Sequence, residues 1–261
     1  MPPKNALSVS LSQEEVLAVL AYLEAPSLVG LETEILQGLG DDERRLVLGV
    51  AERALIARGF LRPGADNRLE LAPEVQATVG ACAFPEESVI VTRSPVNAIQ
   101  EKYFFHCSRR MVVLHVIPMT AIHQFVALEE KQDMLKAMLS ILSLADLPAP
   151  ACPPATLEQE TLLAARDAAE KGTEAALALL SPAGLEDVTA RELARSLTTL
   201  TASTTLVRVA QKEAAGFTLL QAENGAWVLS PQNGEGENHR VLAVPASPDE
   251  VRQRVRTLLG L

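Results

Sequence analysis

The sequence has few aromatic residues and no excess of positive charge. Phe, Trp and Tyr make up 3% of the 261 residues, so few side chains are available to stack on bases or sugars. The formal net charge is -10, and an acidic chain repels phosphate backbones. These two shortages argue against nucleic-acid binding as the first interpretation, and we expect no nucleic-acid partner.

Cysteine is also scarce, and long apolar runs are missing. Cys82, Cys107 and Cys152 are widely spaced and odd in number, which is unlike a disulfide framework or a zinc ribbon. The N-terminus lacks the apolar core of a signal peptide. No uninterrupted apolar run approaches the ~20 residues of a membrane span. We therefore expect a cytoplasmic protein with reduced thiols and no membrane segment.

Motifs that would carry catalysis are absent as well. The chain has no GxSxG elbow, no phosphate-cradling glycine loop and no Cys placed at a helix start near a His. Four histidines are present, at positions 106, 115, 123 and 239. His106 and Cys107 are consecutive in a predicted strand and so point to opposite faces. We interpret the histidines as polar residues at strand edges or ends, and predict no enzyme activity, no cofactor and no metal.

What is present is a globular composition, with 48% hydrophobic and 21% charged residues. Ser12-Gln13-Glu14-Glu15 is a capping box before an apolar-periodic helix. A second helix is expected over 42–58, with Gly59 as its cap, and its inner stripe is predicted to be Leu46, Val47, Val50 and Ala54. Residues 60–71 indicate a short hairpin.

The residue pattern changes after residue 83, from helical periodicity to strand-like runs. Four β-branched or aromatic runs predict an antiparallel meander over 88–128, namely 88–93, 102–107, 111–117 and 122–128. A helix over 129–144 follows. Residues 148–155 hold Pro148, Pro150, Pro153 and Pro154 and indicate a stiff linker.

The part after the linker is expected to repeat this plan. Thr156 and Thr189 are each predicted to begin a capping box before a helix. Strands are expected over 204–209, 217–221, 227–230 and 239–244, and Ser247 caps a final helix. Val89 falls on Thr205 at an offset of 116, Met111 on Ala226 at 115, and His123 on His239 at 116. We therefore predict an α+β fold of two pseudo-symmetric repeats, 1–147 and 156–261. Each has helices, an antiparallel meander and a closing helix.

The order helix, helix, hairpin in residues 1–83 is also that of a winged helix. Six arginines lie in the second helix and the hairpin, at positions 44, 45, 53, 58, 62 and 68. A winged-helix transcriptional regulator with a sensory αβ domain is therefore the alternative function. Acidic neighbours of Arg44 and Arg45 dilute that basic patch.

The layout resembles the EspG family of type VII (ESX) secretion chaperones. The similar local sequence is Ala51-Glu52-Arg53-Ala54-Leu55-Ile56-Ala57-Arg58-Gly59, then a hairpin, then Cys82-Ala83-Phe84-Pro85 and a strand. The resemblance implies an α/β fold with related halves and a non-enzymatic chaperone or adaptor that binds a secreted helical polypeptide in the cytosol. No sequence feature predicts the oligomeric state.

One loop is the candidate binding site. Ser94-Pro95-Val96-Asn97-Ala98-Ile99-Gln100 joins two predicted strands and is longer than the commonest hairpin connections. Its counterpart, 210–216, carries Lys212 and Glu213 instead. A repeat diverges where one copy has acquired a role, so we predict that Val96, Asn97 and Ile99 contact the partner polypeptide.

Overall fold

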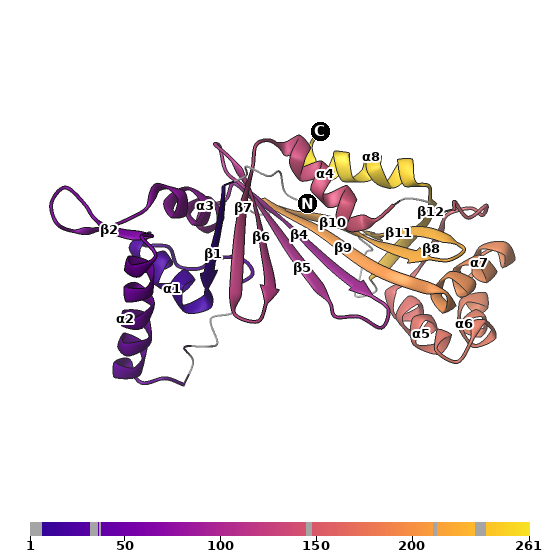
Figure 1. The fold of residues 1–261 in the computed structure, drawn as a ribbon. Coiled ribbons are helices and arrows are strands. Elements are labelled where there is room, and N and C mark those ends of the chain that lie inside the picture. Colours follow the sequence, from indigo (N-terminus) through magenta and orange to yellow (C-terminus); the bar gives the residue numbers. More distant parts are fainter. Residues whose placement is uncertain (1–6, 32–35, 37, 145–147, 211–212, 233–238) are drawn as a thin grey trace. The chain divides into compact units, whose positions relative to one another are not determined.

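The computed structural model describes residues 7–31, 36, 38–144, 148–210, 213–232 and 239–261, which form two compact units (Figure 1). The first unit comprises 1–90, 102–137 and 209–213. The second comprises 91–101, 138–208 and 214–261. Residues 145–147, where the first predicted repeat ends, lie outside the described residues. Residues 148–154 of the predicted linker form neither helix nor strand.

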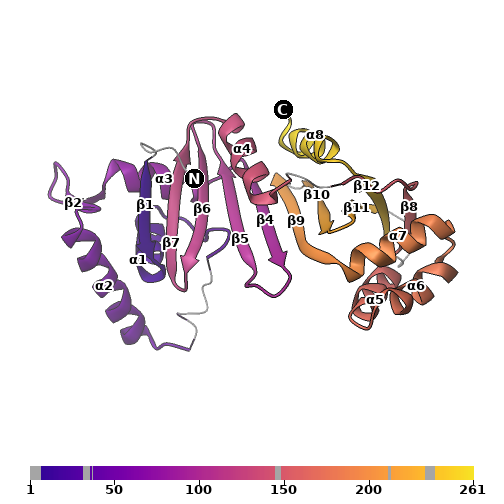
Figure 2. The ribbon, with the colours of Figure 1, turned by 45° about the vertical axis from the view of Figure 1, so that its right-hand side comes forward.

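In its described residues, the first unit is built from antiparallel strands and four helices, the last of which crosses the unit boundary. Its elements in chain order are β1 (Ser8–Ser12), α1 (Gln13–Tyr22), α2 (Asp41–Ala57), β2 (Leu61–Pro63), β3 (Leu69–Leu71), α3 (Pro73–Ala83), β4 (Glu87–Pro95), β5 (Glu101–Cys107), β6 (Val112–Met119), β7 (Ile122–Leu128) and α4 (Lys131–Leu142). The strands lie in the order β1-β7-β6-β5-β4 (Figure 2), and β2 and β3 form a separate hairpin. The unit boundary falls within β4, β5 and α4.

One apolar core joins α1, α2 and α3 to the sheet. Val16 of α1, Leu55 of α2 and Val79 of α3 are fully buried and pack with Leu11 of β1 and Phe125 of β7. Because the buried Val9 and Leu11 alternate with more exposed serines along β1, one face of the sheet receives the helices. The Ser12 capping box is confirmed: Ser12 Oγ accepts from the Glu15 amide at 3.2 Å, and the Glu15 carboxylate accepts from the Ser12 amide at 2.8 Å.

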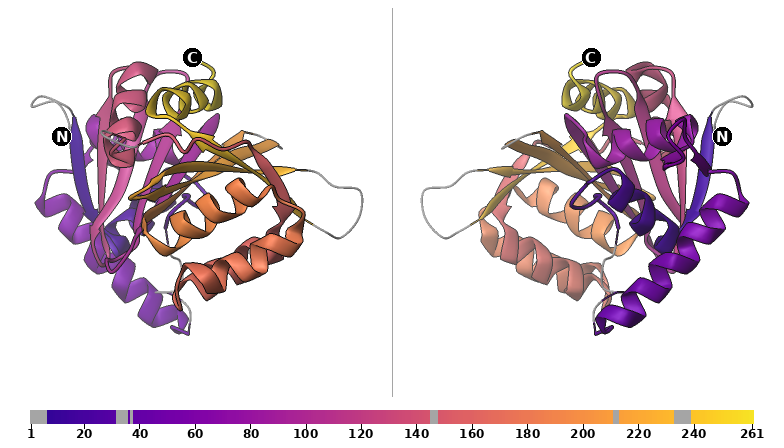
Figure 3. Two further views of the ribbon diagram at one scale, coloured as in Figure 1. Left: turned by 90° about the vertical axis from the view of Figure 1, so that its right-hand side faces the viewer. Right: turned by 90° about the vertical axis from the view of Figure 1, so that its left-hand side faces the viewer.

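The second unit also combines antiparallel strands with helices. Its further elements are β8 (Ala155–Glu158), α5 (Gln159–Ala169), α6 (Thr173–Leu180), a 3-10 turn (Ser181–Ala183), α7 (Asp187–Thr198), β9 (Leu200–Ala210), β10 (Glu213–Ala222), β11 (Gly225–Gln232), β12 (Arg240–Ala246) and α8 (Pro248–Leu259). The strands lie in the order β9-β10-β11-β12-β8. Figure 3 shows α5 and α7 on one face of these strands and α8 on the other.

Trp227 anchors the core of the second unit. Its ring is fully buried with Leu162, Leu180 and Leu193, and its indole N–H donates to Ser196 Oγ at 2.8 Å. The hydrogen bond lets the polar edge of the ring enter the core without an unsatisfied donor.

The α+β fold class is confirmed, together with the four strands over 88–128, the helix after them and the Ser247 capping box. The Thr156 and Thr189 boxes are wrong. Thr156 belongs to strand β8, which pairs with β12, and α7 begins at Asp187, two residues before Thr189. The predicted inner stripe of α2 is also wrong. Ala51 and Leu55 face the core, whereas Leu46 and Val50 are 66% and 52% exposed.

Candidate functional site

The predicted binding loop, Ser94–Gln100, forms the tip of the β4–β5 hairpin. Strand β4 ends at Pro95 and β5 begins at Glu101, so five residues make the connection. Asn97 takes the left-handed conformation, with φ 60°. Asn tolerates this region better than most residues, and it supplies the turn that a glycine would otherwise make. The structure therefore gives Asn97 a backbone role in shaping the loop.

Polar contacts hold this hairpin at its base. The Val96 amide donates to the Thr201 carbonyl at 2.9 Å, which ties the loop to β9. The Gln100 side-chain amide donates to Ser94 Oγ at 3.1 Å, and the Arg93 guanidinium pairs with the Glu101 carboxylate at 3.1 Å. These contacts link the two ends of the loop to each other and attach the loop to β9.

Val96 and Ile99 both lie on this tip and face solvent. Val96 is 47% exposed and Ile99 is 89% exposed, the highest value among the large apolar side chains that the structure describes. An aliphatic side chain held in water on a fixed backbone gains free energy when a partner covers it, roughly 1.5–3 kcal/mol for full burial. Chemically, the site can supply apolar contact and backbone hydrogen bonds, as protein–protein interfaces do.

The corresponding part of the second half differs from this hairpin. Strand β9 extends to Ala210 and β10 begins at Glu213, so Glu213 and Gly216 lie in a strand. Lys212 lies outside the described residues. A Cβ at Gly216 would collide with the Leu206 carbonyl oxygen. The two strands approach closely there, and only two residues separate β9 from β10, against five between β4 and β5.

Three histidines form a buried row instead of lying at strand edges or ends. His106 of β5, His115 of β6 and His123 of β7 are each at most 2% exposed, which corrects the sequence-based interpretation. Their rings are stacked, with ring centroids 5.9 Å apart for His106 and His115 and 5.1 Å apart for His115 and His123. Phe104 and Phe125 join the same stack. Stacking explains the burial, because each ring packs through its apolar face.

Burial favours the neutral form of His106 and His115. Desolvation lowers the pKa of His106 to about 4. Desolvation, and secondarily the neighbouring His106 and His123, lowers the pKa of His115 to about 2. Within the described residues, no group of three His, Cys, Asp or Glu side chains is arranged to hold a metal ion. Parallel stacked rings do not converge on one point as ligands of a tetrahedral site must.

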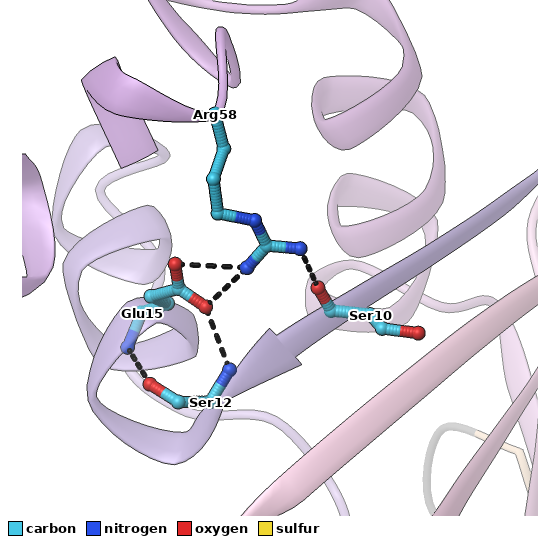
Figure 4. Close-up of polar contacts among 4 residues, drawn as sticks. All are labelled: Ser10, Ser12, Glu15 and Arg58. Atoms are coloured by element: carbon cyan, nitrogen blue, oxygen red, sulfur yellow. Dashed lines mark hydrogen bonds and ion pairs between the residues drawn. The ribbon is translucent and has the colours of Figure 1, made fainter. Parts of the chain in front are cut away.

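The arginines of the winged-helix alternative are largely engaged with acids. Arg58 donates through Nη1 to both Glu15 oxygens, at 2.9 and 2.7 Å, and through Nη2 to the Ser10 carbonyl at 2.6 Å (Figure 4). The Glu15 side chain is 6% exposed. This contact fixes the end of α2 to the start of α1.

Other arginines of this region also meet carboxylates. Arg62 reaches Glu74 at 3.4 Å, and Arg68 reaches Asp66 at 3.3 Å. Such pairs reduce the positive field that a phosphate backbone would need.

A shallow pocket of about 430 Å³ lies between α3 and the β5–β6 turn. Its lining combines Ala77, Gly80 and Ala81 with the exposed Phe84 ring. At its rim Arg109 pairs with Glu86 at 2.7 Å. The lining offers apolar contact and an ion pair.

These features define a class of protein: two α+β units with a fixed hairpin that presents apolar side chains. The model of the EspG family matches residues 12–257, and the chain belongs to this family. No curated protein matches the chain.

Among solved structures, the chain is similar to that of the Mycobacterium tuberculosis type VII secretion system chaperone EspG5 in complex with the PE25–PPE41 dimer. The TM-score is 0.63 at 13% identity, over 97% of this chain and 95% of that chain. At this identity the likeness establishes the fold. The family and the fold do not support the winged-helix regulator.

Proposed function

We propose that this protein is a chaperone or adaptor of type VII secretion that binds a helical polypeptide in the cytoplasm and carries out no catalysis. The observation that carries the proposal is the β4–β5 hairpin. It holds Val96 and Ile99 in solvent on a backbone fixed to β9 by the Val96–Thr201 hydrogen bond. Membership of the EspG family supports the chaperone role.

The structural neighbour narrows the kind of partner. EspG5 was solved with a PE25–PPE41 dimer, so we infer that the partner here is also a dimer of the PE and PPE kind. Two aliphatic side chains on one tip can form the centre of a small hot spot, surrounded by the polar groups of Ser94 and Gln100. None of the helices in the described part of the chain is long and apolar enough to cross a membrane.

Co-expression tests this function. The protein would be produced with each PE–PPE-type pair encoded by the source genome, and the tagged partner would be purified at physiological salt. We expect a stable 1:1 complex with at least one pair. If every pair is soluble and folded on its own yet none co-purifies, the chaperone proposal is wrong.

A further inference from the structure

Helix α2 presents an apolar face that the core of its own unit leaves uncovered. Ala51 and Leu55 point inward, and Glu52 accepts a hydrogen bond from Tyr22 of α1 at 2.8 Å on the flank. On the opposite side, Leu46 and Val50 are 66% and 52% exposed. Figure 2 shows α2 at the margin of the first unit.

Charges of opposite sign stand at the two ends of this face. Asp42 is 98% exposed, and its ion pair with Arg45 is long, at 3.7 Å. Arg53 forms no ion pair with any residue that the structure describes. Asp42 and Arg53 are eleven residues apart, which is three turns, so both lie on the same side of the helix as Leu46. They are separated by about 16 Å along its axis.

Between these charges, the face has one large side chain and, one turn later, a gap. Leu46 projects outward, and one turn later Gly49 has no side chain. A Cβ at Gly49 would meet only the Arg53 guanidinium, at 3.7 Å. The order along the face is therefore Asp42, Leu46, Gly49 and Arg53, at spacings of four, three and four residues. When a second copy of this helix runs antiparallel to the first, acid faces base and the large side chain faces the gap. The face is therefore complementary to itself in charge and in shape.

We propose that α2 pairs with α2 of a second copy of this chain, antiparallel and about a two-fold axis that passes between Val47 and Leu48. Asp42 of each copy lies against Arg53 of the other, and Leu46 of each fills the space over Gly49 of the other. A two-fold interface requires each patch to match itself, and a helix face with palindromic spacing meets that requirement.

A helix from an unrelated partner would fit this face less specifically. Such a partner would need an acid and a base at the matching spacing, whereas the second copy supplies both. One helix pair covers less area than the 1,200–2,000 Å² typical of stable complexes. The dimer is therefore weak and forms at high protein concentration. It is independent of the chaperone function, which uses the β4–β5 hairpin.

Sedimentation velocity of the full chain tests the pairing over ~1 to ~200 µM protein, the range in which micromolar association is visible. We expect a monomer–dimer equilibrium for the wild type. Gly49→Leu should weaken the dimer tenfold or more, because the added side chain has room in the monomer but occupies the site of Leu46. Leu163→Asp, at a half-exposed position on α5 away from this face, is the control and should leave the equilibrium unchanged.

A charge exchange makes the test specific for the antiparallel register. Asp42→Arg alone and Arg53→Asp alone should each remain monomeric, because like charges then face each other twice. Mixing these two variants should restore a heterodimer, since both contacts again join opposite charges. A wild type that is monomeric throughout the range would overturn the proposal. So would a dimer that Gly49→Leu leaves intact, or a mixture of the charge variants that stays monomeric while circular dichroism shows folded chains.

Discussion

His115 Nε2 and His123 Nδ1 are 2.9 Å apart in the interior of the first unit and share one hydrogen bond. One ring must donate its N–H and the other must accept, so both rings cannot carry a proton on these atoms at once. His106 adds a second buried contact through Nδ1, 3.0 Å from Ser88 Oγ. The His115–His123 contact therefore excludes a doubly protonated pair, and burial lowers the pKa of His106 and His115.

We predict that the free energy of unfolding falls as the pH falls below about 6.5. The folded pKa of His106 is lowered to about 4, so between these values the unfolded state binds more protons. Stability is then complete above pH 6.5 and is lost progressively down to pH 4. The slope is at most about 1.4 kcal/mol per pH unit for each such histidine.

Urea unfolding at pH 7.5 and pH 5.5 measures this effect. The variant His106→Leu, which cannot titrate, should lose less stability between the two pH values than the wild type, although its absolute stability is lower. His239→Leu, at an exposed histidine, is the control and should follow the wild type. Equal losses in all three proteins would show that the buried row does not govern the acid response.

Removing the cation from the Arg58–Glu15 pair should destabilise the first unit. Arg58→Met leaves the Glu15 carboxylate, 6% exposed, without its charged partner, and we expect a loss of about 2 kcal/mol. This lies below the usual range for fully buried pairs, because the Arg58 side chain is 40% exposed. Arg45→Met, at a pair exposed on both sides, should cost under about 0.5 kcal/mol. A double-mutant cycle with Glu15→Gln that gives no coupling energy would contradict this reading.

Two glycines should respond to alanine in opposite directions. Gly216→Ala should cost about 2 kcal/mol, because its Cβ collides with the Leu206 carbonyl and the two strands must shift. Gly80→Ala, in α3 with nothing within 4 Å of a Cβ, should stabilise the protein by up to about 1 kcal/mol. Chemical denaturation of the two variants gives both signs. A stabilised Gly216→Ala would mean that β9 and β10 are further apart than described.

We propose that residues 1–147 and 156–261 are copies of one repeat. Strand pairing corrects the alignment of the last strand of the two halves. Leu114 pairs with Val126, and its counterpart Leu229 pairs with Ala243, so Val126 corresponds to Ala243. The offset for the last strand is therefore 117 (243−126), in place of the 116 predicted from His123 and His239. An experimental structure should superimpose β4–β7 and α4 on β9–β12 and α8 at these offsets. A different strand order in the two halves would exclude duplication.

Sequence patterns predicted the elements whose signals are local. The four strands over 88–128 and the Ser12 and Ser247 caps depend on periodicity and on residues three apart, and all are confirmed. Strands β1 and β8 were missed, because each is five residues or shorter and is stabilised by pairing with a strand distant in sequence. A strand of this kind has no sufficient signal of its own.

Burial was the harder quantity to predict. Leu46 and Val50 fit an amphipathic helix pattern, but the core of the first unit contacts the side of α2 that carries Ala51 and Leu55. The histidines looked like surface residues, because nothing local shows that their rings stack with Phe104 and Phe125. For the binding loop, the length and composition of the loop indicated Val96 and Ile99. The left-handed backbone conformation of Asn97 became visible only in the structure.

The affinity of the hairpin variant tests the proposed function most directly. The PE–PPE-type dimer found by co-expression would be titrated into the wild type, Val96→Asp/Ile99→Asp and Met119→Asp. Met119 is a control at another hairpin tip, 70% exposed. We predict that the double variant, folded by circular dichroism, binds at least tenfold more weakly, because two charges replace apolar contacts at the interface, while Met119→Asp binds like the wild type. Equal affinity for all three proteins would show that the β4–β5 hairpin is not the partner-binding site.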